Sequence, residues 1–229
     1  MGDLNSKHAL YCFWTGNNEM SPQRKRCLEL LSYTEADIVL ITDKNLHEYV
    51  KYDPIHEAYP YLSETHRADY LRTYFMHFIG GGYSDIKVPG GSWSSAFEEI
   101  ETSDDIYCVG YREINAGSVE PYVPQIVQDN WMKILGNGAY IFKADTEFTR
   151  EWYGSCKKLL DDSIEQLKKY PATHPRQTCS GIHGVGQMPG YEYPFRWGQL
   201  LSEIFHPICY KHRNKLSKNL PRPDLCNYR

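Results

Sequence analysis

The stretch HRADYLRTYFMHFIGGGYSDIKV, from His66 to Val88, predicts a helix, a glycine break and a short strand. Apolar side chains at positions 68, 71, 75 and 78 follow the spacing of one helix face. Ser63 is a suitable N-cap for this helix, and the glycines from Gly80 to Gly82 end it. Tyr83 to Val88 then alternates like a strand. We therefore expect the helix to lead through a sharp turn directly into a strand of a sheet.

Two polar pairs mark this stretch. Asp69 and Arg72 lie three residues apart on the helix, while Asp85 and Lys87 would share one side of the strand. A helical pair such as Asp69 and Arg72 is usually a surface salt bridge worth less than ~1 kcal/mol. Here the pair precedes a glycine turn that leads straight to an acid, which favours a functional role. The cluster suits a ligand that carries both hydroxyls and phosphates.

The first 90 residues alternate between strand and helix patterns. Residues 8–14 predict a buried strand, and Ser21 and Pro22 are the N-cap and first residue expected of a helix at 21–33. The apolar run 38–42 is typical of a strand buried on both faces. This alternation predicts an α/β fold with an open sheet.

The later elements are less regular. We expect a short helix at 93–101, strands at 106–110 and 138–142, and a long helix at 147–170. From Pro171 the chain is rich in Gly, Pro and Ser, which indicates a lid or an active-site loop. A helix at 197–205 is expected next, and the basic tail from Lys211 is interpreted as a surface arm.

Composition limits the classes of function. The 229 residues fit a single domain, with halves at 1–90 and 91–229. The formal net charge of −4 gives no electrostatic reason to expect nucleic acid as a partner. Seven cysteines occur without a C-x-x-C pair, which favours a reducing compartment, so we expect a cytoplasmic location. No run of 18 apolar residues occurs, so we expect no membrane span in this chain.

Ligands of an open α/β sheet bind outside the carboxyl ends of its strands. Three loops are expected at such ends, namely Thr15–Asn18, Asp43–Asn45 and Asp85–Lys87. Their polar side chains would face one crevice, so we count Thr15 and Asp43 among the ligand-binding residues. A helix cap is an equally good interpretation of Asp43, and core packing is an equally good one of Trp14.

The segments ADYLR and GGGYSDIKV together resemble ADxLRxxxLxxxGGxYxDxD, a pattern of sugar-nucleotide transferases. That pattern is found in the glycosyltransferase family 32 type enzymes, in capsular-polysaccharide transferases and in the large clostridial glucosylating toxins. Phe13 to Gly16 is similar to the opening W-x-G of that group, and Asn137 to Ile141, with Phe148, to its N-x-A...PF element. The resemblance covers roughly residues 8–150. It implies a GT-A (Rossmann-like) fold, whose open, mostly parallel sheet is flanked by helices.

The resemblance also implies roles for individual residues. Trp14 would stack on the base of a nucleotide-sugar donor. Asp69 and Arg72 would hold hydroxyls of the donor sugar or the ribose. Asp85 would be the first acid of the DxD motif and would touch the ribose or a metal-bound water.

Lys87 departs from that pattern, because it replaces the second DxD acid, which normally binds Mn²⁺. A lysine cannot ligate a divalent cation and repels one. Either Lys87 itself neutralises the donor phosphates, or Asp85 holds Mn²⁺ or Mg²⁺ together with His183 or His206, or the site binds a nucleotide without transfer. We rank weak or absent metal dependence slightly ahead of an ordinary Mn²⁺ site, and we assign Asp85 and Lys87 to catalysis.

The second half offers further candidates. His183 and Arg196 are groups suited to contact the donor diphosphate, although both are also typical of ordinary loop residues. Glu113 and Asp129 follow the 106–110 strand and are candidates for a general base, and we place Asp129 in the catalytic set. If the chain resembles retaining enzymes, it requires no such base, so the stereochemistry is left open.

These features predict a glycosyltransferase of hexosyl or deoxyhexosyl type, of the kind used in polysaccharide biosynthesis. A UDP-sugar is the expected donor, with GDP- and dTDP-sugars as alternatives, and the acceptor is a hydroxyl of a glycan or glycoconjugate. Residues 1–90 would bind the donor, and residues 91–229, with their C-terminal loop and tail, the acceptor. The alternative is a catalytically inactive nucleotide-sugar-binding module of a larger assembly. We expect Asp85→Ala to abolish turnover with little change in the melting temperature.

Overall fold

The computed structural model describes residues 8–188 and 190–226. Its centre is a six-stranded sheet in the order β2-β1-β3-β5-β4-β9. The strands are β1 (Ala9–Trp14), β2 (Asp37–Thr42), β3 (Gly81–Ser84), β4 (Cys108–Arg112), β5 (Leu135–Phe142) and β9 (Leu216–Ser217). Only β5 runs against its neighbours, so the other five strands share one direction. The expected open, mostly parallel sheet is confirmed.

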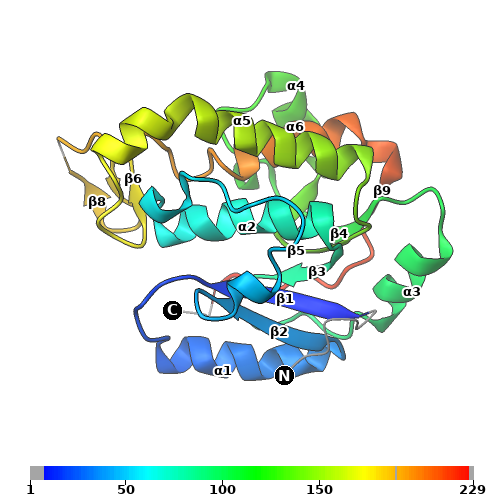
Figure 1. The fold of residues 1–229 in the computed structure, drawn as a ribbon. Helices are drawn as coiled ribbons and strands as arrows, with labels where there is room; N and C mark the ends of the chain where they lie inside the picture. The colour runs from blue at the N-terminus through cyan, green and yellow to red at the C-terminus, as the bar shows by residue number, and fades with distance from the viewer. Residues whose placement is uncertain (1–7, 189, 227–229) are drawn as a thin grey trace.

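Helices cover both faces of this sheet (Figure 1). They are α1 (Pro22–Leu30), α2 (Glu64–Phe78), α3 (Ser94–Thr102), α4 (Gln125–Asp129), α5 (Glu147–Lys169) and α6 (Ser202–Lys211). Short 3₁₀ turns lie at Leu31–Thr34, Leu46–Glu48, Tyr59–Tyr61, Ala116–Ser118, Trp131–Lys133 and Arg213–Lys215. The larger core packs α2, α5 and α6 on one face, and the smaller core packs α1 and α3 on the other.

Strand β1 divides its side chains between the two cores, as strand geometry dictates. Tyr11 and Phe13 point to the larger core, whereas Leu10 and Cys12 point to the smaller one. A strand with two apolar faces must be covered on both sides, which explains why the run 8–14 has no polar alternation. Strand β1 therefore lies between the two cores, and the loop that follows Trp14 begins at one end of the sheet.

Local signals for the helix ends are confirmed. Ser21 caps α1 by accepting a hydrogen bond from the Arg24 amide at 3.1 Å. After α2, Gly80 and Gly81 adopt φ values of 74° and 87°, which only glycine reaches at little cost. The chain therefore reverses from α2 directly into β3.

Two strand predictions need correction. Among the described residues, β2 is an edge strand with no strand on its outer side, and of its side chains only Val39 and Ile41 are buried. Strand β3 ends at Ser84, so Asp85 and Lys87 lie in the bend that follows rather than on one side of a strand.

The last part of the chain also differs from expectation. Residues 216–217 of the basic tail add strand β9 parallel to β4, instead of forming a surface arm. The expected helix at 197–205 begins only at Ser202, as α6. The loop-rich segment before it holds a small antiparallel sheet of β6 (Gln177–Thr178), β7 (Gly181–Ile182) and β8 (Gly186–Gln187).

The two expected halves share the central sheet, since β3 from the first pairs with β5 from the second. Figure 1 shows the small β6–β8 sheet beside the first turn of α2, at the end of the molecule where β1 runs into its following loop. Within residues 8–188 and 190–226, no helix has the length and apolar character that a bilayer crossing requires.

Candidate active site

A cleft of about 760 Å³ opens at the carboxyl ends of β1 and β3. Its walls are the loop after β1, one side of α2, the bend after β3, and parts of the segment 174–202. Seven of the residues expected from the sequence line it: Trp14, Thr15, Asp69, Arg72, Asp85, Lys87 and His183. The main polar cluster predicted from the sequence is thus brought together at the edge of the sheet where ligands are expected.

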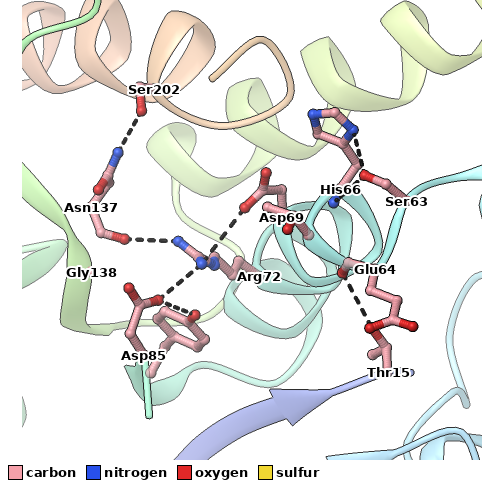
Figure 2. Close-up of polar contacts among 12 residues, drawn as sticks. Thr15, Ser63, Glu64, His66, Asp69, Arg72, Asp85, Asn137, Gly138 and Ser202 are labelled. Atoms are coloured by element: carbon pink, nitrogen blue, oxygen red, sulfur yellow. Dashed lines mark hydrogen bonds and ion pairs between the residues drawn. The ribbon is translucent and has the colours of Figure 1, made fainter. Parts of the chain in front are cut away.

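Asp85 lies beside Arg72 in this cluster (Figure 2). Its Oδ1 accepts hydrogen bonds from Arg72 Nη2 at 2.9 Å and from the Tyr83 hydroxyl at 2.6 Å. Its Oδ2 accepts one from Lys87 Nζ at 2.6 Å. The backbone amide of Asp85 donates to the Gly138 carbonyl on β5 at 2.8 Å. Each carboxylate oxygen therefore has a cationic donor, and the side chain is fixed in one orientation.

The charges around Asp85 decide its protonation. Burial raises the pKa of Asp85, but the charges of Lys87 and Arg72 outweigh that effect and hold the pKa well below its usual range. The carboxylate is therefore ionised at neutral pH. Together the three side chains carry one net positive charge in a partly buried place, which attracts an anion to the bend after β3.

Asp69 is buried and lacks a hydrogen-bond partner at one oxygen. Its side chain is 2% exposed, and its Oδ1 lies 3.6 Å from Arg72 Nη2, beyond hydrogen-bond distance. Burial raises the pKa of Asp69 to about 7, and the charge of Arg72 offsets this only in part. A buried polar atom without a partner is costly, and a ligand hydroxyl in the cleft would satisfy it.

The first turn of α2 is tied to the loop after β1. Ser63 caps the helix, since its hydroxyl accepts from the His66 amide, as predicted. The Thr15 hydroxyl donates to the Glu64 carbonyl at 3.2 Å (Figure 2). Gly16 leaves room for the Glu64 carboxylate, which a Cβ at position 16 would meet at 2.1 Å. Thr15 therefore uses its hydroxyl to position the helix that carries Asp69.

His66 ties the same helix to the segment before α6. Its ring is fully buried, with Nδ1 2.7 Å from the Tyr193 hydroxyl and Nε2 3.0 Å from the Arg196 carbonyl oxygen. Burial lowers the pKa of His66 to about 4, so the ring is neutral at pH 7. In that form Nε2 donates to the Arg196 carbonyl while Nδ1 accepts from the hydroxyl side. Two walls of the cleft are thus held together by one side chain.

Trp14 and the stacked pair of His183 and Trp197 are among the aromatic residues that line the cleft. Trp14 is partly exposed, and its indole Nε1 donates to the Asn18 carbonyl at 2.9 Å. Trp14 therefore borders the cleft and also packs, partly buried, against the smaller core. His183 lies in the turn between β7 and β8 and stacks on Trp197, with ring centroids 3.7 Å apart. Both rings of this stack also line the cleft.

Three expected site residues lie elsewhere. Asp43 is exposed beyond β2, 3.9 Å from Arg67, and does not line the cleft. Arg196 forms an ion pair with Glu203 and lines a smaller neighbouring cavity. Asp129 is exposed at the end of α4 and lines neither cavity. Asp43 was expected here from its place after a strand, Arg196 from its charge in the C-terminal loop and Asp129 from its place in the chain. None of these local signals specifies the long-range packing that directs the three side chains elsewhere.

Two further candidates are buried outside both cavities. Glu113 is 5% exposed, and burial raises its pKa. His206, on α6, is 0% exposed, and burial lowers its pKa to about 4. Neither residue lines the cleft, so His206 does not join Asp85 and Glu113 does not face the same space.

The structure adds residues that the sequence prediction missed. Arg24 of α1 reaches the cleft and donates to the Ile86 carbonyl at 2.6 Å. Asn137 accepts a hydrogen bond from Arg72 Nη1 at its carbonyl oxygen, 3.0 Å away, and also lines the cleft. Arg176, before β6, adds another cation. Asn137 lies in the quoted N-x-A element, which was a signal for it, whereas nothing local marked Arg24 or Arg176.

The residues present do not fit a divalent cation. Lys87, Arg72 and Tyr83 occupy both oxygens of Asp85, and two of these neighbours are positively charged. Within the described ranges, no three His, Cys, Asp or Glu side chains gather in a way that could hold a metal ion. We therefore derive no step of a reaction through a metal.

Comparisons with known proteins give few matches. No protein-family model matches the sequence, and no curated protein matches it. One solved structure, PaToxG Glycosyltransferase, is similar over 89% of this chain and 68% of that chain, with 9% identity and a TM-score of 0.46. The fold class therefore rests on the strands themselves. A six-stranded, mostly parallel sheet between two helical layers is the α/β arrangement expected of a GT-A-like, Rossmann-like fold.

Proposed function

We propose that this chain is a glycosyltransferase that moves a hexosyl or deoxyhexosyl group from a nucleotide-diphosphate donor, a UDP-sugar, to a hydroxyl of a glycan or glycoconjugate. One observation carries the proposal. The Asp69 carboxylate, one oxygen of which accepts no hydrogen bond, and the cation-bound carboxylate of Asp85 lie in one cleft. We propose that this reaction is a step of polysaccharide biosynthesis.

The chemistry of the lining suits each part of such a donor. Carboxylate oxygens accept hydrogen bonds from sugar hydroxyls, and Asp69 has an oxygen free for one. A diphosphate needs cationic donors, and Lys87, Arg24 and Arg176 supply them within the same cleft. The partly exposed ring of Trp14 is a suitable platform for the uracil base.

The reaction places new negative charge on the leaving group. The bond from the anomeric carbon to the diphosphate oxygen breaks, and its electron pair stays on the phosphate. The acceptor oxygen forms the new bond to the anomeric carbon, and its proton passes to a phosphate oxygen of the departing nucleotide or to solvent. A cation fixed beside the leaving oxygen stabilises this transition state. We assign that task to Lys87, whose ammonium Asp85 holds at 2.6 Å.

In this proposal, the side-chain cations take the place of the metal ion of a DxD site. With Lys87 and Arg72 beside Asp85, the charge of the leaving diphosphate is met by side chains. We therefore propose that turnover does not depend on Mn²⁺ or Mg²⁺. Activity that falls on addition of EDTA and returns with Mn²⁺ would contradict this part of the proposal.

A panel of sugar nucleotides tests the proposal as a whole. UDP-, GDP- and dTDP-sugars are added to the protein and the melting temperature is measured. At one hundred times its Kd, a donor stabilises the folded state by ~2.7 kcal/mol, which raises the melting temperature of a domain this size by roughly 5–10 °C. Release of the free nucleotide is then followed with and without EDTA. Tight binding without any release would support the inactive binding module, and no binding would refute the proposed function.

A further inference from the structure

A second cavity adjoins the cleft. Its volume is about 290 Å³, and it lies between the β6–β8 sheet and the segment around residues 120–122. Three residues, His183, Trp197 and Gly198, line both this cavity and the cleft. A stacked pair of rings and a glycine, which has no side chain, therefore belong to the wall that the two spaces share.

A carboxylate lies against that glycine. A Cβ at Gly198 would come within 2.3 Å of Glu120 Oε1, so the carboxylate packs on the glycine backbone. Glu120 lines the second cavity and does not line the cleft. Its charge is also among those that raise the pKa of Asp69, after burial and the charge of Asp85, which is consistent with its place near the shared wall.

The rest of the lining combines one aromatic platform with small polar groups. Tyr122 is 64% exposed, and the Arg196 guanidinium lies 4.3 Å from its ring centroid. Arg196 is in turn held by Glu203, with Nε 3.0 Å from Glu203 Oε1. Thr178, Ser180 and Gln187 contribute hydroxyl and amide groups. An anchored ring with one acid and several neutral polar groups suits a sugar ring, which has an apolar C–H face and hydroxyls around its edge.

Transfer requires that the acceptor oxygen come within about 3–3.5 Å of the anomeric carbon. The acceptor must therefore bind beside the donor cleft, and the second cavity shares a wall with that cleft. We propose that the second cavity is the acceptor site and that it takes a hexopyranose, the terminal sugar of a glycan, with its ring on Tyr122 and one of its hydroxyls on Glu120. This inference rests on the proposed function, because it assigns the acceptor of the same reaction.

Gly198 lines both cavities, and Glu120 lies against it. A hydroxyl bound to Glu120 would lie near Gly198, whose backbone belongs to the wall shared by the two spaces. Glu120 is thus proposed to hold and orient the acceptor hydroxyl. Burial and the nearby charge of Glu203 raise the pKa of Glu120, whereas the charge of Arg196 lowers it.

The test uses methyl glycosides of glucose, galactose and N-acetylglucosamine as acceptor probes. Saturation-transfer NMR measures their binding to the full chain in the presence of UDP. The variants are Tyr122→Ala and Glu120→Gln, with Tyr33→Ala and Glu165→Gln as matched controls at residues 67% and 87% exposed. UDP binding is measured separately by thermal shift.

We expect at least one glycoside to bind the wild type, and each of the two variants to lower its affinity by about tenfold, while the UDP shift and both controls stay unchanged. Glu120→Gln is nearly isosteric, so a loss of glycoside binding without loss of melting temperature is not a folding effect. Equal glycoside binding by wild type and both variants would overturn the inference, as would binding of a serine-containing peptide but of no glycoside. Absence of a UDP shift would refute the proposed donor, whereas glycoside binding that depends on Tyr122 would still support a sugar site.

Discussion

Replacing Asp85 by asparagine removes one negative charge from between two cations without changing the size of the side chain. Hydrogen bonds to charged groups contribute ~1.5–3 kcal/mol each, and breaking a buried ion pair costs ~3–5 kcal/mol. The Asp85 side chain is 21% exposed, so water recovers part of this loss. We expect Asp85→Asn to lower the free energy of unfolding by ~2–3 kcal/mol at pH 7, which corresponds to ~4–12 °C in melting temperature. This differs from the expectation for Asp85→Ala drawn from the sequence, because the sequence did not reveal that Arg72 and Lys87 both bind this carboxylate.

The pH dependence of this effect provides a sharper assay. The folded pKa of Asp85 lies below the ordinary value of ~3.9. Its contribution to stability is therefore complete above that pH and is lost as the pH falls towards the folded pKa. Urea denaturation at pH 7, 4 and 3 should show a difference between wild type and variant that shrinks by up to ~1.4 kcal/mol per pH unit below ~3.9. Equal stability at pH 7, or a difference that grows in acid, would refute the reasoning. The control Asp162→Asn, at an exposed position of α5, should show neither effect.

Three further predictions follow from the same contacts. Asp69→Asn should raise the free energy of unfolding on the order of 3 kcal/mol at pH 8 but not near pH 4. The folded pKa of Asp69, about 7, lies above the ordinary ~3.9, so the ionised carboxylate destabilises the wild type as the pH rises. Urea denaturation at both pH values measures the difference, and a variant less stable than wild type at pH 8 would contradict it. Lys87→Met should lower kcat for nucleotide release by ~10²–10³. The control Lys158→Met, at an exposed position of α5, should leave kcat unchanged, and similar kcat values for the two variants would contradict the role assigned to Lys87. Ser21→Ala should lower the free energy of unfolding by ~1 kcal/mol, because it removes the N-cap of α1. Ser155→Ala, at an exposed position of α5, should lower it by less than ~0.5 kcal/mol. Equal melting temperatures of the two variants in differential scanning calorimetry would exclude the cap effect.

The parts of the fold that were predicted correctly depend on neighbours in the sequence. The cap at Ser21, the glycine reversal at Gly80 and the apolar strand β1 are all local patterns. The edge position of β2 and the addition of β9 to the sheet depend on which strands pair, and pairing joins residues far apart in the chain. A short apolar run predicts a strand, but it does not state how many neighbours that strand will have.

The same distinction separates the site residues. Asp69, Arg72, Asp85 and Lys87 came together as predicted because one helix, one turn and one bend connect them within 19 consecutive residues. Arg24 was missed because its partner Ile86 lies 62 positions away. Position 129 was interpreted as catalytic from chain order, yet the packing of α4 directs that side chain to the surface.

Strand β9 is two residues long and pairs with Cys108 and Val109 of β4 at one border of the central sheet. Without Leu216 and Ser217, the amides and carbonyls of β4 would lack the partners that now lie beside them. Unpaired strand borders invite pairing with a second copy of the same chain. A shortened protein that ends before residue 216 would therefore be prone to self-association, and protein engineers who trim this chain for crystallisation should retain its last strand.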